Sequence, residues 1–289
     1  MQAVDHIPRY GVLKQTDAPD EIASAVESLG LLGFAVLDAG YPRERVAELQ
    51  DRFKKVRAQT LATYGAARLR AIGEHTTIRC PLAQDSIFLD LATNERVLEV
   101  CTQLIGTGFI LNQQNGVVNP GDEPNYSQGL YHRDLPYQHF VSSRPLAINA
   151  LYCIDAFTIE NGCTLVLPAS HKQEAFPSDE FVRRNEKPVV APAGSFLLLD
   201  CMIYHSGGQN LSGRDRCAVN HVYTIGLMRQ QIDLPAFLGE DFVCDPKLRR
   251  LLGYDYATPR SVADYYEGRE RKLNTSPAQS ARATNQNGA

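Results

Sequence analysis

The stretch Gly129-Leu-Tyr-His-Arg-Asp-Leu-Pro136 holds the pattern on which the fold assignment depends, because His132 and Asp134 lie two residues apart in a run that reads as a β-strand. Alternate side chains of a strand share one face, so this imidazole and this carboxylate should point the same way. The apolar run 194–204 predicts a buried strand that ends at His205. Two histidines and one carboxylate suit non-haem Fe(II) and leave coordination positions open. We therefore predict that His132, Asp134 and His205 bind a metal.

Other interpretations of these residues exist. Short His-x-Asp pairs occur by chance, and three protein ligands with a water also describe a hydrolytic zinc site. No glutamate stands nearby as a general base, which favours iron. Arg216 opens a further strand-like run, 217–224, and a guanidinium close to a metal suits the far carboxylate of a dicarboxylic acid. Arg214, two residues away on the same side of that strand, is the alternative.

Three segments in this order resemble a known family. They are Tyr131-His-Arg-Asp134, Glu160-Asn-Gly-Cys-Thr-Leu-Val-Leu-Pro-Ala-Ser-His171, and His205 with Arg216. Over about residues 20–255 the chain resembles the phytanoyl-CoA dioxygenase family of Fe(II)- and 2-oxoglutarate-dependent oxygenases. The middle segment departs from the family pattern at Ala169, where the family usually has glycine. That departure does not affect a metal ligand.

The resemblance implies the cofactors and the residues that bind them. Fe(II) would be held by His132, Asp134 and His205, which are then the catalytic residues, and 2-oxoglutarate and O2 would be the co-substrates. Arg216 would pair with the distal carboxylate of 2-oxoglutarate. Thr164 would donate its hydroxyl to the same carboxylate, unless it packs by its methyl group as strand threonines do.

The resemblance also implies the reaction. Relatives that halogenate carry a small residue at the position of Asp134, so a carboxylate there implies hydroxylation, or another oxidation of an unactivated C–H bond without halide transfer. No basic cluster demands a CoA group, which favours a small secondary-metabolism intermediate over an acyl-CoA of the phytanoyl-CoA type. The alternative from another class is a non-catalytic cupin-like binding protein. The intact metal triad and Arg216 argue against it.

Amide side chains crowd the run Asn112-Gln-Gln-Asn-Gly-Val-Val-Asn119, and amides are costly to bury without partners. Strand alternation places Gln113, Asn115 and Asn119 on one face, toward the cavity, where we expect contact with the co-substrate. Gln114 on the other face should be exposed to solvent or paired between strands.

Several polar residues remain. Asn149, in an apolar strand-like run, is interpreted as a core amide with satisfied hydrogen bonds. His139 and His221 lack the spacing of the triad and are not expected to bind the metal. Tyr137, His139 and Arg229 fall in loop segments, where substrate contacts usually lie.

The spacing of elements predicts a β-rich α+β fold with a double-stranded β-helix (jelly-roll, cupin-like) core. Helices are expected over 21–29, ended by Gly30, and over 42–56 and 95–104, packed on one outer face. Short strands separated by Gly/Pro turns follow, at 108–118, 129–134, 146–155, 163–167, 188–190, 194–199 and 218–224. We interpret residues 1–273 as one oxygenase domain and 274–289 as a disordered tail without a periodic apolar face.

Composition limits the remaining classes of function. The chain has 289 residues, 44% of them hydrophobic, a net charge of -4 and a pI near 6.0. These values do not show the excess of positive charge that is typical of nucleic-acid-binding proteins. No apolar run approaches the ~20 residues that cross a membrane, and the N-terminus shows no secretory signal, so we expect a cytoplasmic protein. Its seven cysteines form no C-x-x-C pair and should be reduced. The sequence is compatible with a homodimer and does not fix the oligomeric state.

Overall fold

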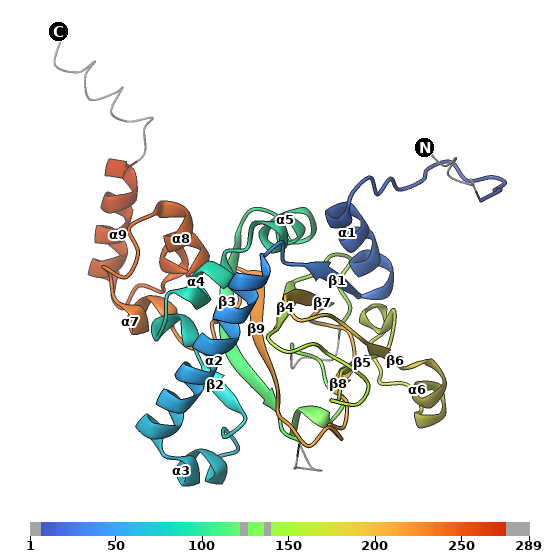
Figure 1. The fold of residues 1–289 in the computed structure, drawn as a ribbon. Coiled ribbons are helices and arrows are strands. Elements are labelled where there is room, and N and C mark those ends of the chain that lie inside the picture. Colours follow the sequence, from blue (N-terminus) through green and yellow to red (C-terminus); the bar gives the residue numbers. More distant parts are fainter. Residues whose placement is uncertain (1–6, 122–126, 136–139, 276–289) are drawn as a thin grey trace.

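Two antiparallel sheets form the core of the protein. The computed structural model describes residues 7–121, 127–135 and 140–275 (Figure 1). A six-stranded sheet has the order β1-β7-β4-β9-β3-β2, and a three-stranded sheet has the order β6-β5-β8. The strands of the large sheet are β1 (Phe34–Asp38), β7 (Ser195–Asp200), β4 (Ala147–Cys153), β9 (Arg216–Ile225), β3 (Phe109–Asn119) and β2 (Thr77–Arg79). Those of the small sheet are β6 (Lys187–Val189), β5 (Thr164–Val166) and β8 (His205–Gly207).

Helices cover one face of the large sheet (Figure 1). The helices are α1 (Glu21–Leu32), α2 (Arg43–Tyr64), α3 (Ala66–Ala71), α4 (Ile87–Ala92), α5 (Glu95–Leu104), α6 (Asp179–Asn185), α7 (Leu234–Leu238), α8 (Pro246–Leu251) and α9 (Val262–Thr275). Residues of α1, α2, α4, α5, α7 and α8 belong to the core on this face, whereas α6 lies beside β6 of the small sheet (Figure 1). The main core packs helix residues such as Phe53 and Val97 against alternate residues of β4, among them Ala150 and Tyr152. The predicted arrangement of a jelly-roll core with helices on one outer face is thereby confirmed.

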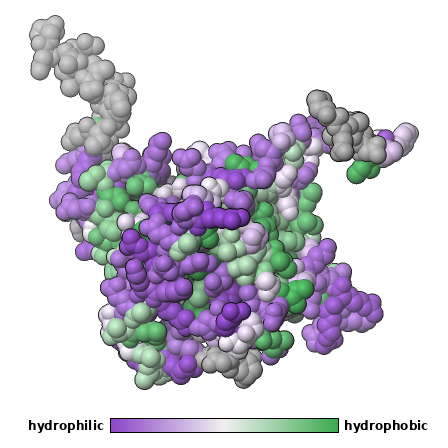
Figure 2. Space-filling view, in the orientation of Figure 1, coloured by the Kyte–Doolittle hydropathy of each residue, from purple (hydrophilic) through white to green (hydrophobic). Residues whose placement is uncertain are grey.

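The surface of the protein is largely hydrophilic over some of these helices (Figure 2). Hydrophilic side chains cover α6 and the front of the molecule over α2 (Figure 2). Within the described residues, no helix combines the length and the apolar character that crossing a membrane requires.

The first helix is longer than its sequence suggested. Gly30 was expected to end it, but α1 continues to Leu32, and the next residue, Gly33, adopts a left-handed φ of 86°. The backbone N–H of Gly33 donates to the carbonyls of Ser28 and Leu29 and so caps the helix. A glycine inside a helix costs some stability but does not end it, whereas a left-handed C-terminal residue does.

Two predictions about the metal-binding segments were wrong. Residues 129–134 do not form a strand; the segment touches the small sheet through one isolated antiparallel bridge, His132 with His205. The apolar strand β7 ends at Asp200, whose carboxylate accepts the backbone N–H of Met202 in a tight turn. His205 is therefore the first residue of β8 and does not end the apolar strand.

The two faces of the large sheet have different compositions. Pairing of β3 with β9 puts Gln113 opposite Val222, Asn115 opposite Asn220, and Asn119 opposite Arg216. These pairs occupy the face turned away from the helix layer, as strand alternation predicted for Gln113, Asn115 and Asn119. We call it the interior face.

Gln114 lies on the helix-covered face of β3. The expectation that it is exposed or paired between strands was wrong, because it is 1% exposed. Its Nε2 donates to the Phe88 carbonyl at 2.6 Å and its Oε1 accepts from the Leu82 N–H at 2.8 Å. Both ends of this amide thus attach the segment that contains α4 to the sheet.

Candidate metal centre

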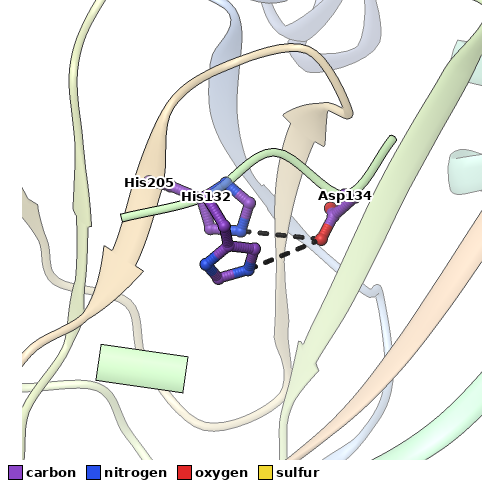
Figure 3. A group of neighbouring side chains, drawn as sticks. All are labelled: His132, Asp134 and His205. Atoms are coloured by element: carbon purple, nitrogen blue, oxygen red, sulfur yellow. Dashed lines mark ion pairs between the residues drawn. The ribbon is translucent and has the colours of Figure 1, made fainter. Parts of the chain in front are cut away.

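His132, Asp134 and His205 converge at one point (Figure 3). Each offers one ligand atom, and these atoms lie within 4.8 Å of one another. The Nε2 atoms of His132 and His205 are 3.9 and 3.7 Å from Asp134 Oδ1, and the two ring centroids are 4.4 Å apart. Two imidazole nitrogens and one carboxylate oxygen therefore face a common centre.

Backbone carbonyls fix which nitrogen of each ring is available. His132 Nδ1 lies 2.8 Å from the carbonyl of Leu130, and His205 Nδ1 lies 3.1 Å from the carbonyl of Ile203. A carbonyl accepts only, so each Nδ1 carries the proton and each Nε2 keeps its lone pair. Both rings are in the tautomer that can bind a metal through Nε2.

The Asp134 carboxylate is oriented by Asn149. Asn149 Nδ2 donates to Asp134 Oδ2 at 2.8 Å, while Oδ1 is the atom that faces the histidines. Sequence reasoning interpreted Asn149 as a satisfied core amide, yet it contacts the metal-binding carboxylate, and its Oδ1 has no hydrogen-bond partner among the described residues. A polar residue in the otherwise apolar β4 was the available signal.

Burial favours the neutral form of His205, the form that binds metals. The residue is 6% exposed, and burial lowers its pKa, although the nearby Asp134 carboxylate acts in the opposite direction. A neutral imidazole at physiological pH needs no deprotonation before it can coordinate a cation.

Arg133 anchors the segment that carries His132 and Asp134. Arg133 is 4% exposed, and its guanidinium lies 3.9 Å from the centre of the Tyr204 ring and donates to the carbonyls of Ser170, Gln173 and Glu174. Burial lowers its pKa. These contacts tie the segment to the 170–174 turn. Sequence reasoning missed this residue; its signal was a charged side chain between two ligands.

Arg216 opens β9 and is 4% exposed on the interior face. Its guanidinium lies 3.9 Å from the centre of the Phe157 ring. Arg214 is exposed in the preceding turn, outside β9. Thr164, 4% exposed, lies on β5 opposite Gly207, two residues from the Val166–His205 pair. Of the two arginines, only Arg216 is buried in the core.

The three interior amides of β3 have different partners. Asn119, 1% exposed, donates through Nδ2 to the carbonyls of Gly162 and Gly208 and so holds two loops together beside Arg216. Asn115 donates to the Gln231 side chain at 3.1 Å. Gln113 follows a bulge at Asn112 and is partly buried.

Some sequence-predicted residues are not at the triad. Tyr137 and His139 lie outside the described residues. Arg229 is exposed in the segment after β9, and its carbonyl accepts from the Asn112 side chain. His221 lies on the helix-covered face, where its Nδ1 lies 3.0 Å from the Ala150 carbonyl and burial lowers its pKa to about 4. His171 is 2% exposed in the turn under α1.

A jelly roll whose interior carries a His-x-Asp pair and a distant histidine defines a class of metal-binding oxygenase scaffolds. The chain belongs to the phytanoyl-CoA dioxygenase (PhyH) family, which residues 31–218 match. This finding confirms the resemblance from which a dioxygenase was expected.

Relatives in sequence and structure agree with the family. Uncharacterized proteins Rv1501 of Mycobacterium tuberculosis and Mb1539 of Mycobacterium bovis are each 30% identical over 253 residues, which is 86% of this chain and 92% of theirs. The fold is similar to that of EctD from S. alaskensis, solved with 2-oxoglutarate and 5-hydroxyectoine, at a TM-score of 0.57 and 23% identity over 73% of this chain and 78% of that one. The epimerase SnoN from nogalamycin biosynthesis has a TM-score of 0.53 at 19% identity, over 78% of this chain and 90% of its own.

Proposed function

We propose that the protein is an Fe(II)- and 2-oxoglutarate-dependent dioxygenase that hydroxylates, or otherwise oxidises, an unactivated C–H bond of a small organic molecule. The observation that carries this proposal is the convergence of two Nε2 lone pairs and one carboxylate oxygen on a single point. Family membership and relatives named as dioxygenases, such as af480 of Aspergillus fumigatus, 27% identical over 60% of this chain and 56% of its own, support it.

The donor set fits a ferrous ion. His132, Asp134 and His205 would hold the metal, with Asn149 keeping one oxygen of Asp134 turned toward it. Three protein ligands leave positions open for a co-substrate. Bound there, iron with 2-oxoglutarate and O2 would supply the oxidising power for a C–H bond. Asp134 favours oxidation without halide transfer.

The protein contributes charge, orientation and exclusion of water. Arg216 would bind the distal carboxylate of 2-oxoglutarate, because it is a buried cation on the interior face. Thr164 would add a hydroxyl from β5, and Asn119 would keep the neighbouring loops in place. The low exposure of Arg216 keeps water away and strengthens an ion pair formed there.

The arginine assignment has a direct test. Removing one partner of a buried ion pair weakens binding by several kcal/mol, because the other charge is left buried without a partner. Arg216→Ala should therefore weaken binding of 2-oxoglutarate by about 100-fold or more, measured as the Kd in anaerobic titrations with Fe(II). Arg214→Ala, in the exposed turn, is the matched control and should change the Kd little. A larger effect in Arg214→Ala than in Arg216→Ala would reject the assignment.

We also propose that the protein is cytoplasmic and acts on a soluble metabolite and not on an acyl-CoA. Whether it forms a homodimer can be measured by light scattering coupled to size-exclusion chromatography.

A further inference from the structure

The interior face holds buried amide oxygens without partners. Oδ1 of Asn115 and Oδ1 of Asn220 have no hydrogen-bond partner among the described residues. Asn115 is 5% exposed. The two residues are direct cross-strand partners on β3 and β9, so their Cβ atoms lie within ~5 Å of each other. A buried acceptor without a donor costs stability, which suggests that a ligand completes it.

A chain of hydrogen bonds that starts at a charged pair, Glu74 and Arg79, fixes the orientation of the Asn115 amide. Arg79 is held by the Glu74 carboxylate through two bonds of 2.8 and 2.6 Å. A guanidinium donates only, so its 3.0 Å contact identifies the Gln231 side-chain atom as the oxygen, Oε1. The Asn115 atom 3.1 Å from that oxygen must then be the NH2 group. Asn115 therefore presents its oxygen as the free atom.

The free acceptor oxygen of Asn115 does not suit the co-substrate. At neutral pH 2-oxoglutarate is a dianion whose carboxylates and ketone only accept hydrogen bonds. The free oxygen of Asn115 therefore does not bond the co-substrate, and the expectation that Asn115 contacts it rests on the second N–H of the amide. A ligand that suits this oxygen carries an N–H or O–H group.

The position of this pair connects it with the metal centre. Asn149, whose Nδ2 bonds Asp134, lies on the same interior face as Asn115 and Asn220, because Asn149 pairs with Val222, two residues along β9 from Asn220. The pair therefore lies on the interior face between Arg216 and Val222, the β9 residue that pairs with Asn149.

We propose that the Asn115 side-chain oxygen, with the Asn220 amide beside it, binds a donor group of the substrate, so that the substrate is a small hydroxyl- or amine-bearing molecule. This inference rests on the proposed function and narrows it. An acyl chain offers no donor to this acceptor, whereas a compact polar molecule with an N–H or O–H group does.

The test uses two matched probes on the full-length protein loaded with Zn(II), as a diamagnetic substitute for iron, and 2-oxoglutarate. The probes are trans-4-aminocyclohexanol and its permethylated form, the trimethylammonium methyl ether, which keeps the ring and lacks every N–H and O–H donor. Saturation-transfer NMR should show binding of aminocyclohexanol and a signal at least about fivefold weaker for the permethylated probe, the factor expected from one hydrogen bond.

Three variants locate the binding. Asn115→Leu and Asn220→Val should each weaken aminocyclohexanol binding by about fivefold or more, and Gln103→Leu, on the exposed side of α5, should leave it unchanged. The Kd for 2-oxoglutarate should stay within about twofold of wild type in both asparagine variants, since the co-substrate does not use these oxygens. Asn220→Val should not lower the Tm, because it removes an acceptor without a partner.

Equal binding of both probes, no binding of either by the wild-type protein, or full binding by the asparagine variants would overturn the proposal. A lower Tm in Asn220→Val would assign that residue a structural role and would also overturn it. Each of these results leaves 2-oxoglutarate binding intact, whereas failure of the proposed function would abolish 2-oxoglutarate binding in the wild-type protein.

Discussion

The metal ligands come from two segments that are built differently. His205 begins β8 and pairs with Val166 of β5, so the small sheet sets its position. His132 and Asp134 lie outside every strand, in a segment that joins the small sheet by one bridge and bonds the Cys201 carbonyl through the backbone N–H of Asp134. Side chains add to these few backbone bonds: Arg133 ties the segment to the 170–174 turn, and Asn149 orients the Asp134 carboxylate.

This difference shows where the centre can fail. Backbone hydrogen bonds tolerate most substitutions, because every residue but proline supplies them. The His132–Asp134 segment has few such bonds, to His205 and Cys201, and its contacts with the 170–174 turn depend on the Arg133 side chain. The His132–Asp134 half should therefore be the more fragile half of the metal centre.

The largest effect is expected at Arg133. Arg133→Met should destabilise the protein by about 3 kcal/mol, because the carbonyls of Ser170, Gln173 and Glu174 lose their buried donor. It should also weaken metal binding by roughly 10- to 100-fold, as loss of groups that support ligands does. Chemical denaturation and metal titration measure the two quantities.

Arg184→Met in α6 is the matched control, since Arg184 is an exposed arginine whose side chain is 75% accessible. It should behave like wild type in both measurements. If Arg133→Met bound metal as tightly as this control, the segment would not depend on its anchor, and the contrast between the two halves would fail.

A smaller effect is expected in the turn that leads to His205. Burial raises the pKa of Asp200 to about 6, above the ordinary aspartate value of 3.8. The folded protein then binds a proton that the unfolded chain has released, so the carboxylate lowers stability as the pH rises from about 4 to 6, and this cost persists above pH 6. Asp200→Asn should raise the free energy of unfolding by about 2 kcal/mol at pH 7.5 and hardly at all at pH 4.

Denaturation curves of wild type and Asp200→Asn at the two pH values provide the measurement. Asparagine can still accept the Met202 N–H, so the turn should persist. Equal gains at both pH values would show that protonation of Asp200 is not the cause.

The smallest effect is expected at Ala169, in the turn to which Arg133 is anchored. Ala169 has a φ of 64°, a left-handed conformation that glycine adopts without strain. Ala169→Gly should relieve about 1–2 kcal/mol of backbone strain in the folded protein. About half of this gain should be offset, because glycine gives the unfolded chain more conformational entropy. A net gain of about 0.5 kcal/mol should raise the Tm slightly in calorimetry. A lower Tm would show that the methyl group packs better than the strain costs.

Much of this architecture could be predicted from the sequence. Alternation along β3 assigned Gln113, Asn115 and Asn119 to one face, and the apolar run of β4 indicated a central strand. His132 and Asp134 stood out by type and spacing, because they form the one His-x-Asp pair in the sequence.

The supporting contacts could not be predicted, because they join residues far apart in sequence. Asn149 meets Asp134 across 15 positions, and Arg133 meets Ser170 across 37. Periodicity describes one element at a time and contains no information on such pairs. Gly30 misled for a related reason: propensity favours a helix end there, but the φ that ends the helix belongs to Gly33.

Anaerobic titration with Fe(II) and then 2-oxoglutarate tests the central claim most directly. We expect one equivalent of iron to bind and a weak visible charge-transfer band to appear when 2-oxoglutarate is added. His132→Ala and His205→Ala should each lose the band while keeping the fold by circular dichroism, since both side chains lie at the metal point and outside the helix-packed core. A band of wild-type intensity in either variant would contradict the assignment of the metal centre.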